Sequence, residues 1–373
     1  MSNLNLDKIL RAALNVGASD VHLKVSRTPV FRIEGKLVQL KDVPEVSEQD
    51  LENVANQIMN DWQKQEFEKN LEMDLAYDIP GLSRFRINIF RQRNSTSMAI
   101  RAVPHEIKSF ADLNLPDVLN KIANEERGLV VVTGTTGSGK STTLASIIDL
   151  INSTKSRHII TIEDPIEYMQ SDKKSYINQR EIGIDARSFS RAIRASMRED
   201  PDIILVGEMR DLETMETCLA AAETGHLVLT TLHTLDAQET INRMLTVFPA
   251  HQHNQVRFQL AQVLKAILSQ RLIPKSDGHG RVPAVEVLIA TSRIKDLISD
   301  PVRTKEITVA IQEGNLHYGM QTFDQCLFEL YNNKLITYEE TMRQATNKDD
   351  LALRIQGVTS GSVSLDQYDV TSN

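Results

Sequence analysis

The sequence contains few cysteines and has no long apolar run. Only Cys218 and Cys326 occur among the 373 residues, and two cysteines cannot build a disulfide framework or a four-cysteine zinc site. The most apolar stretches, residues 129–132 and 203–206, are far shorter than the roughly 20 residues that cross a bilayer. We therefore expect neither a membrane span nor a zinc module, and the scattered histidines add no metal site.

A basic surplus and an export signal are also missing. The formal net charge is −8 at pH 7, whereas a protein that coats nucleic acid needs extra Lys and Arg to neutralise phosphates. Residues 1–6 lack the basic stretch, apolar run and small-residue cleavage site of a secretory signal. We expect a cytoplasmic chain whose partner is not nucleic acid.

Short apolar patterns in the first hundred residues predict a small α+β domain. The predicted elements are a helix over 6–13 that stops at Gly17, a strand over 21–25, a hairpin around Gly35, a polar helical stretch over 47–70, and strands over 85–89 and 95–103. We assign residues 1–103 to this domain. Residues 104–116 mix prolines with charges, which is typical of a linker.

The pattern then changes to apolar strands that alternate with helices, which predicts a parallel sheet and places the chain in the α/β class. The predicted strands cover residues 129–133, 159–163, 203–206 and 227–231. We assign residues 117–270 to the core of this α/β domain and 271–356 to a mainly helical C-terminal region. Residues 357–373 have no Lys or Arg and many Ser, Thr and Asp, so we expect a disordered tail there.

The most specific motif is a phosphate-binding loop directly after the first of these strands. It comprises Gly134, Thr135, Thr136, Gly137, Ser138, Gly139, Lys140 and Ser141, with Thr142 next to it. Glycines let backbone N–H groups point at a phosphate, Lys140 adds positive charge, and Ser141 offers a hydroxyl to Mg²⁺. An empty glycine-rich turn is the alternative, but the order of strand, loop and helix favours binding of ATP.

Acidic and histidine residues follow the other strands of the predicted sheet. Parallel strands end at one edge, where ligands of open α/β sheets bind. We assign Glu163 to the attacking water and Glu208, with Ser141, to Mg²⁺. His226 and His233 bracket the fourth strand, where an imidazole can sense a phosphate or bond a carboxylate. A surface carboxylate or a structural histidine is the alternative for each.

Arginines are candidates for stabilising the charge that develops as a phosphate leaves. One group lies on the last strands of the first domain and another on one face of a predicted helix. They are Arg84, Arg86, Arg91, Arg93 and Arg101, and Arg191, Arg194 and Arg198. A solvated charged face is the alternative interpretation for each.

Residues 197–211, which read Met-Arg-Glu-Asp-Pro-Asp-Ile-Ile-Leu-Val-Gly-Glu-Met-Arg-Asp, resemble the signature of the secretion ATPases that drive type II secretion and type IV pili. Residues 18–22, 162–167 and 224–234 are similar to other boxes of this family, so the resemblance covers nearly the whole chain. Residues 319–325 and the compact first domain are most similar to the retraction ATPases of type IV pili. The missing four-cysteine module points away from the assembly ATPases.

The resemblance implies a PAS-like first domain, a flexible linker and a RecA-like ATPase domain, with six chains in a ring and ATP and Mg²⁺ bound between the domains. It also implies a pilus platform protein as partner, and hence a place at the inner membrane. By position, Glu163 matches the family's catalytic glutamate and Glu208 its Walker B glutamate. The matching arginines are Arg86 and Arg101 in the first domain and Arg194, Arg198 and Arg210 in the second.

One stretch departs from the retraction ATPases. Where they resemble one another in Ala-Ile-Arg-Asn-Leu-Ile-Arg-Glu, residues 293–300 read Arg-Ile-Lys-Asp-Leu-Ile-Ser-Asp, which keeps only the apolar spacing. The identity as main or accessory retraction motor therefore stays open. Other functions that stay open are a pilus-assembly or type II secretion ATPase, an accessory nucleotide-gated ring with little turnover, and a nucleic-acid translocase.

Overall fold

The computed structural model describes residues 4–33, 35–41, 43–103 and 107–357. The chain divides into two compact units, one formed by residues 1–106 with 167–169 and one by the remainder. The predicted domain limits themselves stay predictions. The predicted tail lies outside the described residues, apart from Gly357.

The first unit is an antiparallel sheet with the strand order β3-β2-β1-β6-β5-β4. Its strands are β1 (Ala18–Lys24), β2 (Val30–Ile33), β3 (Lys36–Gln39), β4 (Glu72–Ile79), β5 (Ser83–Gln92) and β6 (Ser95–Ala102), and its helices are α1 (Leu6–Asn15), α2 (Glu48–Ile58) and α3 (Asp61–Asn70). The predicted helix, hairpin and final strand pair are confirmed. The stretch at 47–70 forms two helices, since Ser47 and Asn60 each begin a capping box, and β4 was not predicted.

Alternation gives this sheet one apolar and one polar face. Phe85, Ile87 and Ile89 of β5 are buried in the core against the helices. The intervening Arg86 lies directly opposite Arg101 of β6, so both arginines belong to the polar face. Among the described residues, this core is separate from those of the second unit.

The second unit is built on a sheet with the order β13-β12-β7-β11-β10-β8-β9, in which every described pairing is parallel except that of β12 with β13. The strands are β7 (Gly128–Thr133), β8 (His158–Glu163), β9 (Tyr176–Glu181), β10 (Ile203–Val206), β11 (Leu227–Leu232), β12 (Leu264–Pro274) and β13 (Arg281–Ile289). The four strands predicted between 129 and 231 are confirmed. Buried on both faces, they are almost wholly apolar.

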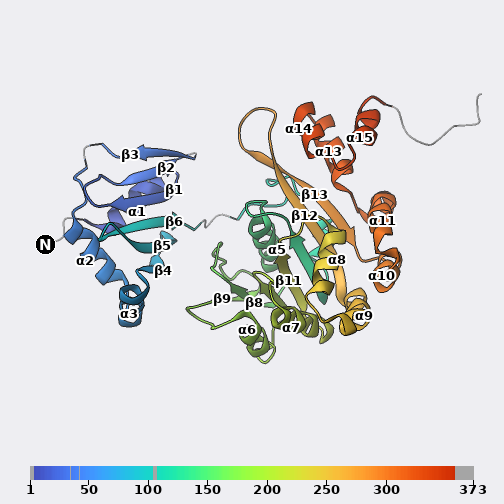
Figure 1. The fold of residues 1–373 in the computed structure, drawn as a ribbon, viewed down its shortest axis with the longest axis horizontal. Coiled ribbons are helices and arrows are strands. Elements are labelled where there is room, and N and C mark those ends of the chain that lie inside the picture. The colour runs from blue at the N-terminus through green and yellow to red at the C-terminus, as the bar shows by residue number, and fades with distance from the viewer. Residues whose placement is uncertain (1–3, 34, 42, 104–106, 358–373) are drawn as a thin grey trace, which may run out of the picture. The chain divides into compact units, whose positions relative to one another are not determined.

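Helices cover both faces of this sheet (Figure 1). Val130 and Val132 of β7 point to the face covered by α4 (Leu119–Ile122) and α5 (Lys140–Thr154). Leu129 and Val131 point to the opposite face. That face packs against α6 (Phe189–Ser196), α7 (Leu212–Glu223), α8 (Ala237–Thr246), α9 (His253–Val263), α10 (Ser292–Ser299) and α11 (Ile307–Glu313).

The region after residue 252 differs from the helical prediction. The long strands β12 and β13 pair over nine residues of each, from Ala266↔Ile289 to Pro274↔Arg281. The predicted domain boundary at 270/271 therefore falls inside β12, and β13 lies in the region expected to be mainly helical. Short apolar runs such as 264–273 cannot be assigned to helix or strand by periodicity alone. The edge strand β9 was missed because four of its six residues, Asn178, Gln179, Arg180 and Glu181, are polar.

Helices are confirmed farther along this region. The last ones are α12 (Asn315–Tyr318), α13 (Phe323–Asn332), α14 (Tyr338–Gln344) and α15 (Lys348–Ile355). Apolar residues of α13 and α15, with Ile336, form a separate core with Ile273, Val282 and Ala284 from the far end of the β12–β13 hairpin (Figure 1). The hairpin thus carries this helical group.

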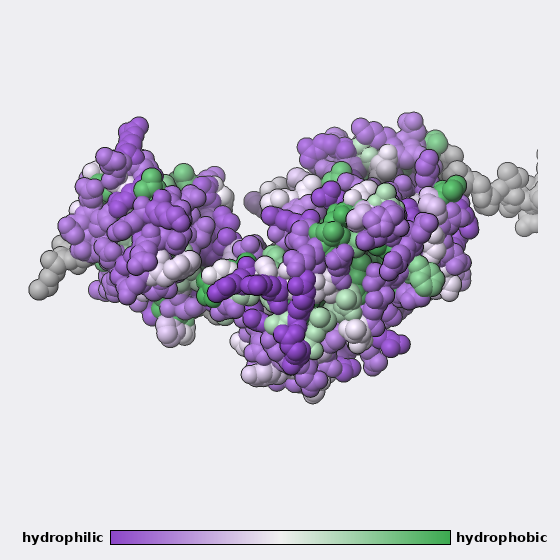
Figure 2. All heavy atoms as spheres, turned by 60° about the horizontal axis from the view of Figure 1, so that its bottom comes forward, coloured by the Kyte–Doolittle hydropathy of each residue, from purple (hydrophilic) through white to green (hydrophobic). Residues whose placement is uncertain are grey.

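Hydrophilic residues cover most of the face shown in Figure 2, and hydrophobic ones form small patches. Within the described part of the chain, no helix is both long and apolar enough to cross a membrane.

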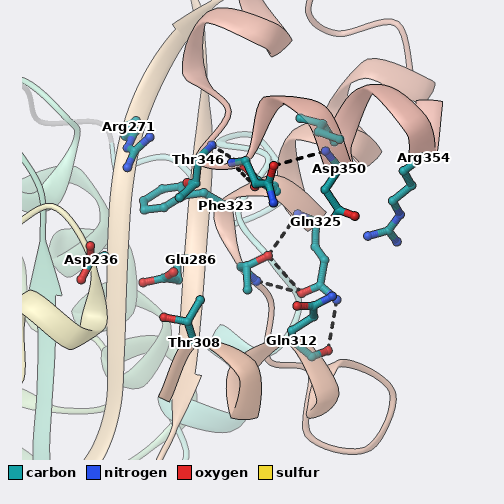
Figure 3. A pocket seen from close by; sticks show the side chains of 14 residues that line it. Asp236, Arg271, Glu286, Thr308, Gln312, Phe323, Gln325, Thr346, Asp350 and Arg354 are labelled. Carbon is teal, nitrogen blue, oxygen red and sulfur yellow. Dashed lines mark hydrogen bonds between the residues drawn. The ribbon is translucent and has the colours of Figure 1, made fainter. Parts of the chain in front are cut away.

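A buried carboxylate lies where the hairpin meets the C-terminal helices. Glu286 of β13 is 5% exposed and lines a cavity of about 260 Å³, together with Asp236 and Arg271 (Figure 3). One oxygen accepts a hydrogen bond of 2.8 Å from Ala237 N–H, while the Arg271 guanidinium lies 3.9 Å from the ring centre of Phe323. Burial raises the pKa of Glu286 to about 7, although the bond from Ala237 opposes this shift.

We expect Glu286 to make stability depend on pH. Its protonated form is favoured by folding, so this contribution is complete below about pH 4.5 and is lost as the pH rises through about 7. Relative to Glu286→Gln, which keeps the acceptor, the wild-type free energy of unfolding should fall by on the order of 2 kcal/mol between about pH 5.5 and 8.5. Urea unfolding at both pH values measures this, with the exposed Glu329→Gln as control. Equal pH dependence of wild type and Glu286→Gln would contradict it.

Candidate functional site

The predicted phosphate-binding loop joins β7 to α5 and is a tight turn that requires glycine. Gly134 has a φ of +141°. A Cβ at this position would lie 2.4 Å from the carbonyl oxygen of Gln270 and 2.5 Å from the Ser138 Oγ, so β12 passes directly behind the loop. Only glycine permits this approach. The sequence pattern of strand, loop and helix is thus confirmed, while nucleotide binding itself remains a prediction.

The loop has the polar groups that an anion needs. The buried Lys140 Nζ donates to the carbonyl oxygens of Gly134 at 2.7 Å and of Thr135 at 3.0 Å, which holds a positive charge within the turn. Ser138 Oγ is buried and has no hydrogen-bond partner among the described residues. The N-terminus of α5, capped by Gly139, has no side-chain cap. The positive end of the helix dipole therefore points at the loop, which suits a phosphate.

A cavity of about 450 Å³ lies beside the loop, a size within the usual range of small-molecule sites. Ser138 and Thr142 line it from the loop and the first turn of α5. The other lining residues come from the segment before α4 and from the β12–β13 hairpin, and include Lys108, Asp112, Leu272, Lys275 and Arg281. The positive side chains of Lys108, Lys275 and Arg281 thus line a cavity that adjoins the phosphate-binding loop.

The strand ends bring the predicted polar residues to one edge. His233, Glu208 and Glu163 follow the parallel neighbours β11, β10 and β8, whose register pairs Leu205 with both Leu229 and Thr161. Adjacent strands lie about 4.8 Å apart, so these three side chains stand in a row that begins next to the loop after β7.

Glu208 is the centre of a charged group. Its carboxylate pairs with Arg210 Nε at 2.6 Å and lies 3.7 Å from His233 Nε2. Burial and the positive charge of Lys140 lower the pKa of His233, and Glu208 only partly offsets this. His233 is therefore neutral near pH 7 and can accept as well as donate a hydrogen bond. The electrostatic effect of Lys140 on His233 links the loop to this group.

Glu163 is held by uncharged donors. Thr161 Oγ donates to its Oε1 at 2.7 Å, and Gln179 Nε2 donates to the same atom at 3.3 Å. Gln179 lies on β9 and was not predicted as a site residue, because β9 itself was not recognised. The sequence around Gln179 is mostly polar, so it lacks the alternation of apolar and polar residues that indicates a strand.

Two groups of predicted residues are not brought to this edge. His226 precedes β11 and therefore lies at the opposite end of that strand from His233, about 20 Å away. Its Nδ1 contacts the carbonyl oxygen of Ala221 at 2.9 Å, as in a structural histidine. The structure thus places His226 away from the strand ends that carry His233, Glu208 and Glu163, and a catalytic role for His226 stays a prediction.

Arg194 of α6 and Arg198, which lies just after this helix, also point away from the strand-end carboxylates. Arg194 pairs with Glu213 of α7 at 2.6 Å, and Arg198 donates to the carbonyl oxygen of Arg194 at 3.1 Å. Both side chains therefore contact α6 and α7 rather than Glu163 or Glu208. Of the predicted second-domain arginines, Arg210 is the one that contacts a strand-end carboxylate.

In the first unit, Arg101 is held in place by an acidic residue. Arg101 Nε donates to Asp20 at 2.8 Å. Burial works against ionisation of Asp20, but hydrogen bonds from Arg101 and Ser19 leave its pKa below the usual value. Asp20 therefore stays ionised and orients Arg101, with Arg86 opposite it in the register. Roles for Arg86 and Arg101 at a phosphate remain predictions.

The oxygen atoms at this edge suit a Mg²⁺ ion that is coordinated mainly by phosphates and water and only partly by the protein. Among the described residues, no three His, Cys, Asp or Glu side chains are grouped to hold a metal ion. Ser141 and Glu208 supply a hydroxyl and a carboxylate, which are the oxygen ligands that Mg²⁺ takes when phosphates and water complete its shell. The residues present fit such an ion, but do not form a closed protein cage.

Comparison with known proteins gives a consistent set of relatives. A family model described as type II/IV secretion system protein matches residues 2–369. The type IV pilus retraction ATPase PilT of Pseudomonas aeruginosa is 43% identical over 342 residues, which are 92% of this chain and 98% of PilT. The type IV pilus ATPase PilU of the same organism is 39% identical over 355 residues, 95% of this chain and 92% of PilU.

A solved structure is similar over the same range. The crystal structure of the pilus retraction motor PilT with bound ADP superposes with a TM-score of 0.86 at 46% identity, and the match covers 94% of this chain and 99% of that one. The order of folds along the chain, an antiparallel sheet unit followed by a unit with the phosphate-binding loop, thus matches a relative that was solved with bound ADP.

The tight approach of β12 to the loop gives a prediction about Gly134. We expect Gly134→Ala to lower the free energy of unfolding by about 2 kcal/mol more than Gly278→Ala, because the new methyl group overlaps Gln270 and Ser138. Gly278 is the matched control, since it also has a positive φ, of +76°, but no atom lies within 4 Å of its Cβ position. Urea unfolding measures both variants, and equal losses would show that the approach is not tight.

Proposed function

The chain belongs to the family of type II/IV secretion system proteins, and we propose that it is a Mg²⁺-dependent ATPase motor that powers retraction of type IV pili. The observation that carries the ATPase is the row of His233, Glu208 and Glu163 beside a phosphate-binding loop. The similarity to PilT over nearly the full length of both proteins supports retraction.

The roles of the residues follow from their positions. Lys140 leaves the carbonyl oxygens of Gly134 and Thr135 to bind the β- and γ-phosphates, and the N–H groups of residues 137–142 surround them. Ser138 gains the partner that it lacks. The remainder of the nucleotide occupies the cavity lined by Lys108, Lys275 and Arg281.

The chemical step needs a carboxylate that orients water and charges that stabilise the leaving phosphate. Glu163 orients and deprotonates the water, and hydrogen bonds from Thr161 and Gln179 hold its carboxylate. Ser141 and Glu208 hold Mg²⁺, which neutralises phosphate charge when bound. His233, neutral near pH 7, is placed to respond to the γ-phosphate by hydrogen bonding.

Mechanical work requires that hydrolysis be coupled to a movement of the two units. We propose that six chains form a ring and that Arg86 and Arg101 reach the nucleotide when ATP closes the cleft between units. Arg101 would exchange its Asp20 partner for phosphate oxygens, since both are anionic acceptors. The predicted linker, residues 104–116, absorbs the movement.

The partner of such a ring is a platform protein of the pilus machine, and the motor is then cytoplasmic and peripheral at the inner membrane. The altered stretch at 293–300 lies on α10, whose Ile294, Leu297 and Ile298 are buried. The apolar spacing that this chain keeps therefore serves the core. The residues that differ from the family sequence lie outside this core, and Arg293, for example, pairs with Glu313. We therefore expect them to affect which partner surface α10 binds rather than how the chain folds.

The chemical proposal is tested by Glu163→Gln. We expect ATP turnover to fall by about 100-fold or more, the range for loss of a general base, while a fluorescent ADP analogue still binds with near wild-type affinity. Glu329→Gln, an exposed change on α13, should keep wild-type turnover. Near-normal phosphate release by Glu163→Gln would remove Glu163 from this role.

Retraction is tested in a Pseudomonas aeruginosa strain that lacks PilT. We expect the wild-type chain to restore twitching zones and Glu163→Gln to leave them absent. A second chain that carries the family sequence Ala-Ile-Arg-Asn-Leu-Ile-Arg-Glu at 293–300 tests the outward face of α10. If only this second chain restores twitching, that face limits coupling. If neither does, although both hydrolyse ATP, retraction is the wrong output.

A further inference from the structure

The carboxylate of Glu163 is oriented by donors from two strands. Thr161 lies two residues earlier on β8, so its side chain shares a face with Glu163, and Gln179 is the register partner of Thr161 on β9. Both donate to Oε1, at 2.7 Å from Thr161 Oγ and 3.3 Å from Gln179 Nε2. Two donors on one oxygen fix the rotation of the carboxylate plane.

The amide of Gln179 is itself held in one orientation. Its Oε1 accepts the backbone N–H of Gln170 at 2.8 Å, so its Nε2 must face Glu163. Gln170 in turn donates through its Nε2 to the carbonyl oxygen of Ala145 at 3.1 Å. Ala145 lies on α5, the helix that begins at the phosphate-binding loop. A continuous series of hydrogen bonds thus runs from α5 through Gln170 and Gln179 to Glu163.

We propose that Gln179 is a positioning residue for ATP hydrolysis, which sets the orientation of the Glu163 carboxylate relative to the helix that holds the phosphates. This inference rests on the proposed role of Glu163. Strand pairing does not need the Gln179 side chain, because β9 is joined to β8 over six residue pairs. The amide serves the carboxylate, and a misplaced base loses catalysis without losing the fold.

The test is Gln179→Met, which keeps side-chain length and removes the donor. We expect kcat to fall by roughly 10- to 100-fold, the effect of a lost hydrogen bond to a charged group, with KM for ATP and Tm close to wild type. Gln259→Met is the matched control. It removes an amide-to-carboxylate bond of 2.8 Å, from Gln259 to Glu223, away from the strand ends, and should leave kcat unchanged.

A second variant separates orientation from general disturbance. Gln179→Glu keeps an acceptor for Gln170 N–H but replaces the donor by a negative charge that faces Glu163. We expect a larger fall in kcat than in Gln179→Met. The rising limb of the pH–rate profile should also move to higher pH, because a like charge disfavours ionisation of the base. A purely structural role of Gln179 would lower Tm and leave this limb in place.

The closing experiment is a double-mutant cycle with Glu163→Gln, measured as single-turnover phosphate release. Gln179→Met should add no further loss in the Glu163→Gln background, since the positioned group is gone. Two outcomes would overturn the positioning role and leave the proposed function in place, provided that Glu163→Gln is inactive. In the first, Gln179→Met has wild-type kcat. In the second, the loss in the double variant is the product of the losses in the two single variants. If Glu163→Gln keeps normal turnover, the proposed function of Glu163 fails first.

Discussion

The structure of the site depends on the parallel register of β7, β11, β10 and β8. Backbone pairing fixes where each strand ends, and hence where the loop after β7, His233, Glu208 and Glu163 stand. A slip of one residue in any of these strands would turn its side chains to the opposite face and break the row. The cost of such a slip is high, because the strands are buried on both faces against α5 on one side and α7 on the other. The burial that stabilises this sheet therefore also determines the geometry of the site.

The parts of this arrangement that follow local rules were predictable from sequence. Apolar strands that alternate with helices gave the four central strands, and the loop spacing gave the phosphate site, because both patterns have a period or a fixed length. The hairpin of β12 and β13 was missed because a short apolar run does not distinguish strand from helix. His226 was grouped with His233 because the sequence shows that both flank one strand, but it takes the strand's direction to see that they lie at opposite ends. Gln179 depends on the pairing of β9 with β8, a contact between distant segments that no local pattern encodes.

Charge is distributed unevenly along the strand ends. Next to the loop, Lys140, Glu208 and Arg210 form a group of opposite charges around His233, whose pKa is lowered by burial first and by the charge of Lys140 second. Two strands farther along, Glu163 contacts a hydroxyl and an amide. Glu208 thus lies among charged side chains, and the two hydrogen bonds to Oε1 of Glu163 come from uncharged donors. Water activation by Glu163 and Mg²⁺ binding by Glu208 stay proposals, which the substitution of Glu163 tests.

The hydrogen bonds around Glu163 also bear on how a motor avoids wasting ATP. Gln170 is hydrogen-bonded to α5, and α5 begins at the loop that we propose binds the phosphates. A shift of this helix on nucleotide binding would therefore change the position of Gln179 and of the Glu163 carboxylate. A base that reaches its working orientation only when the loop is filled cannot activate water in an empty site. This series of hydrogen bonds connects α5 to the carboxylate directly, and it acts beside the proposed movement of Arg86 and Arg101.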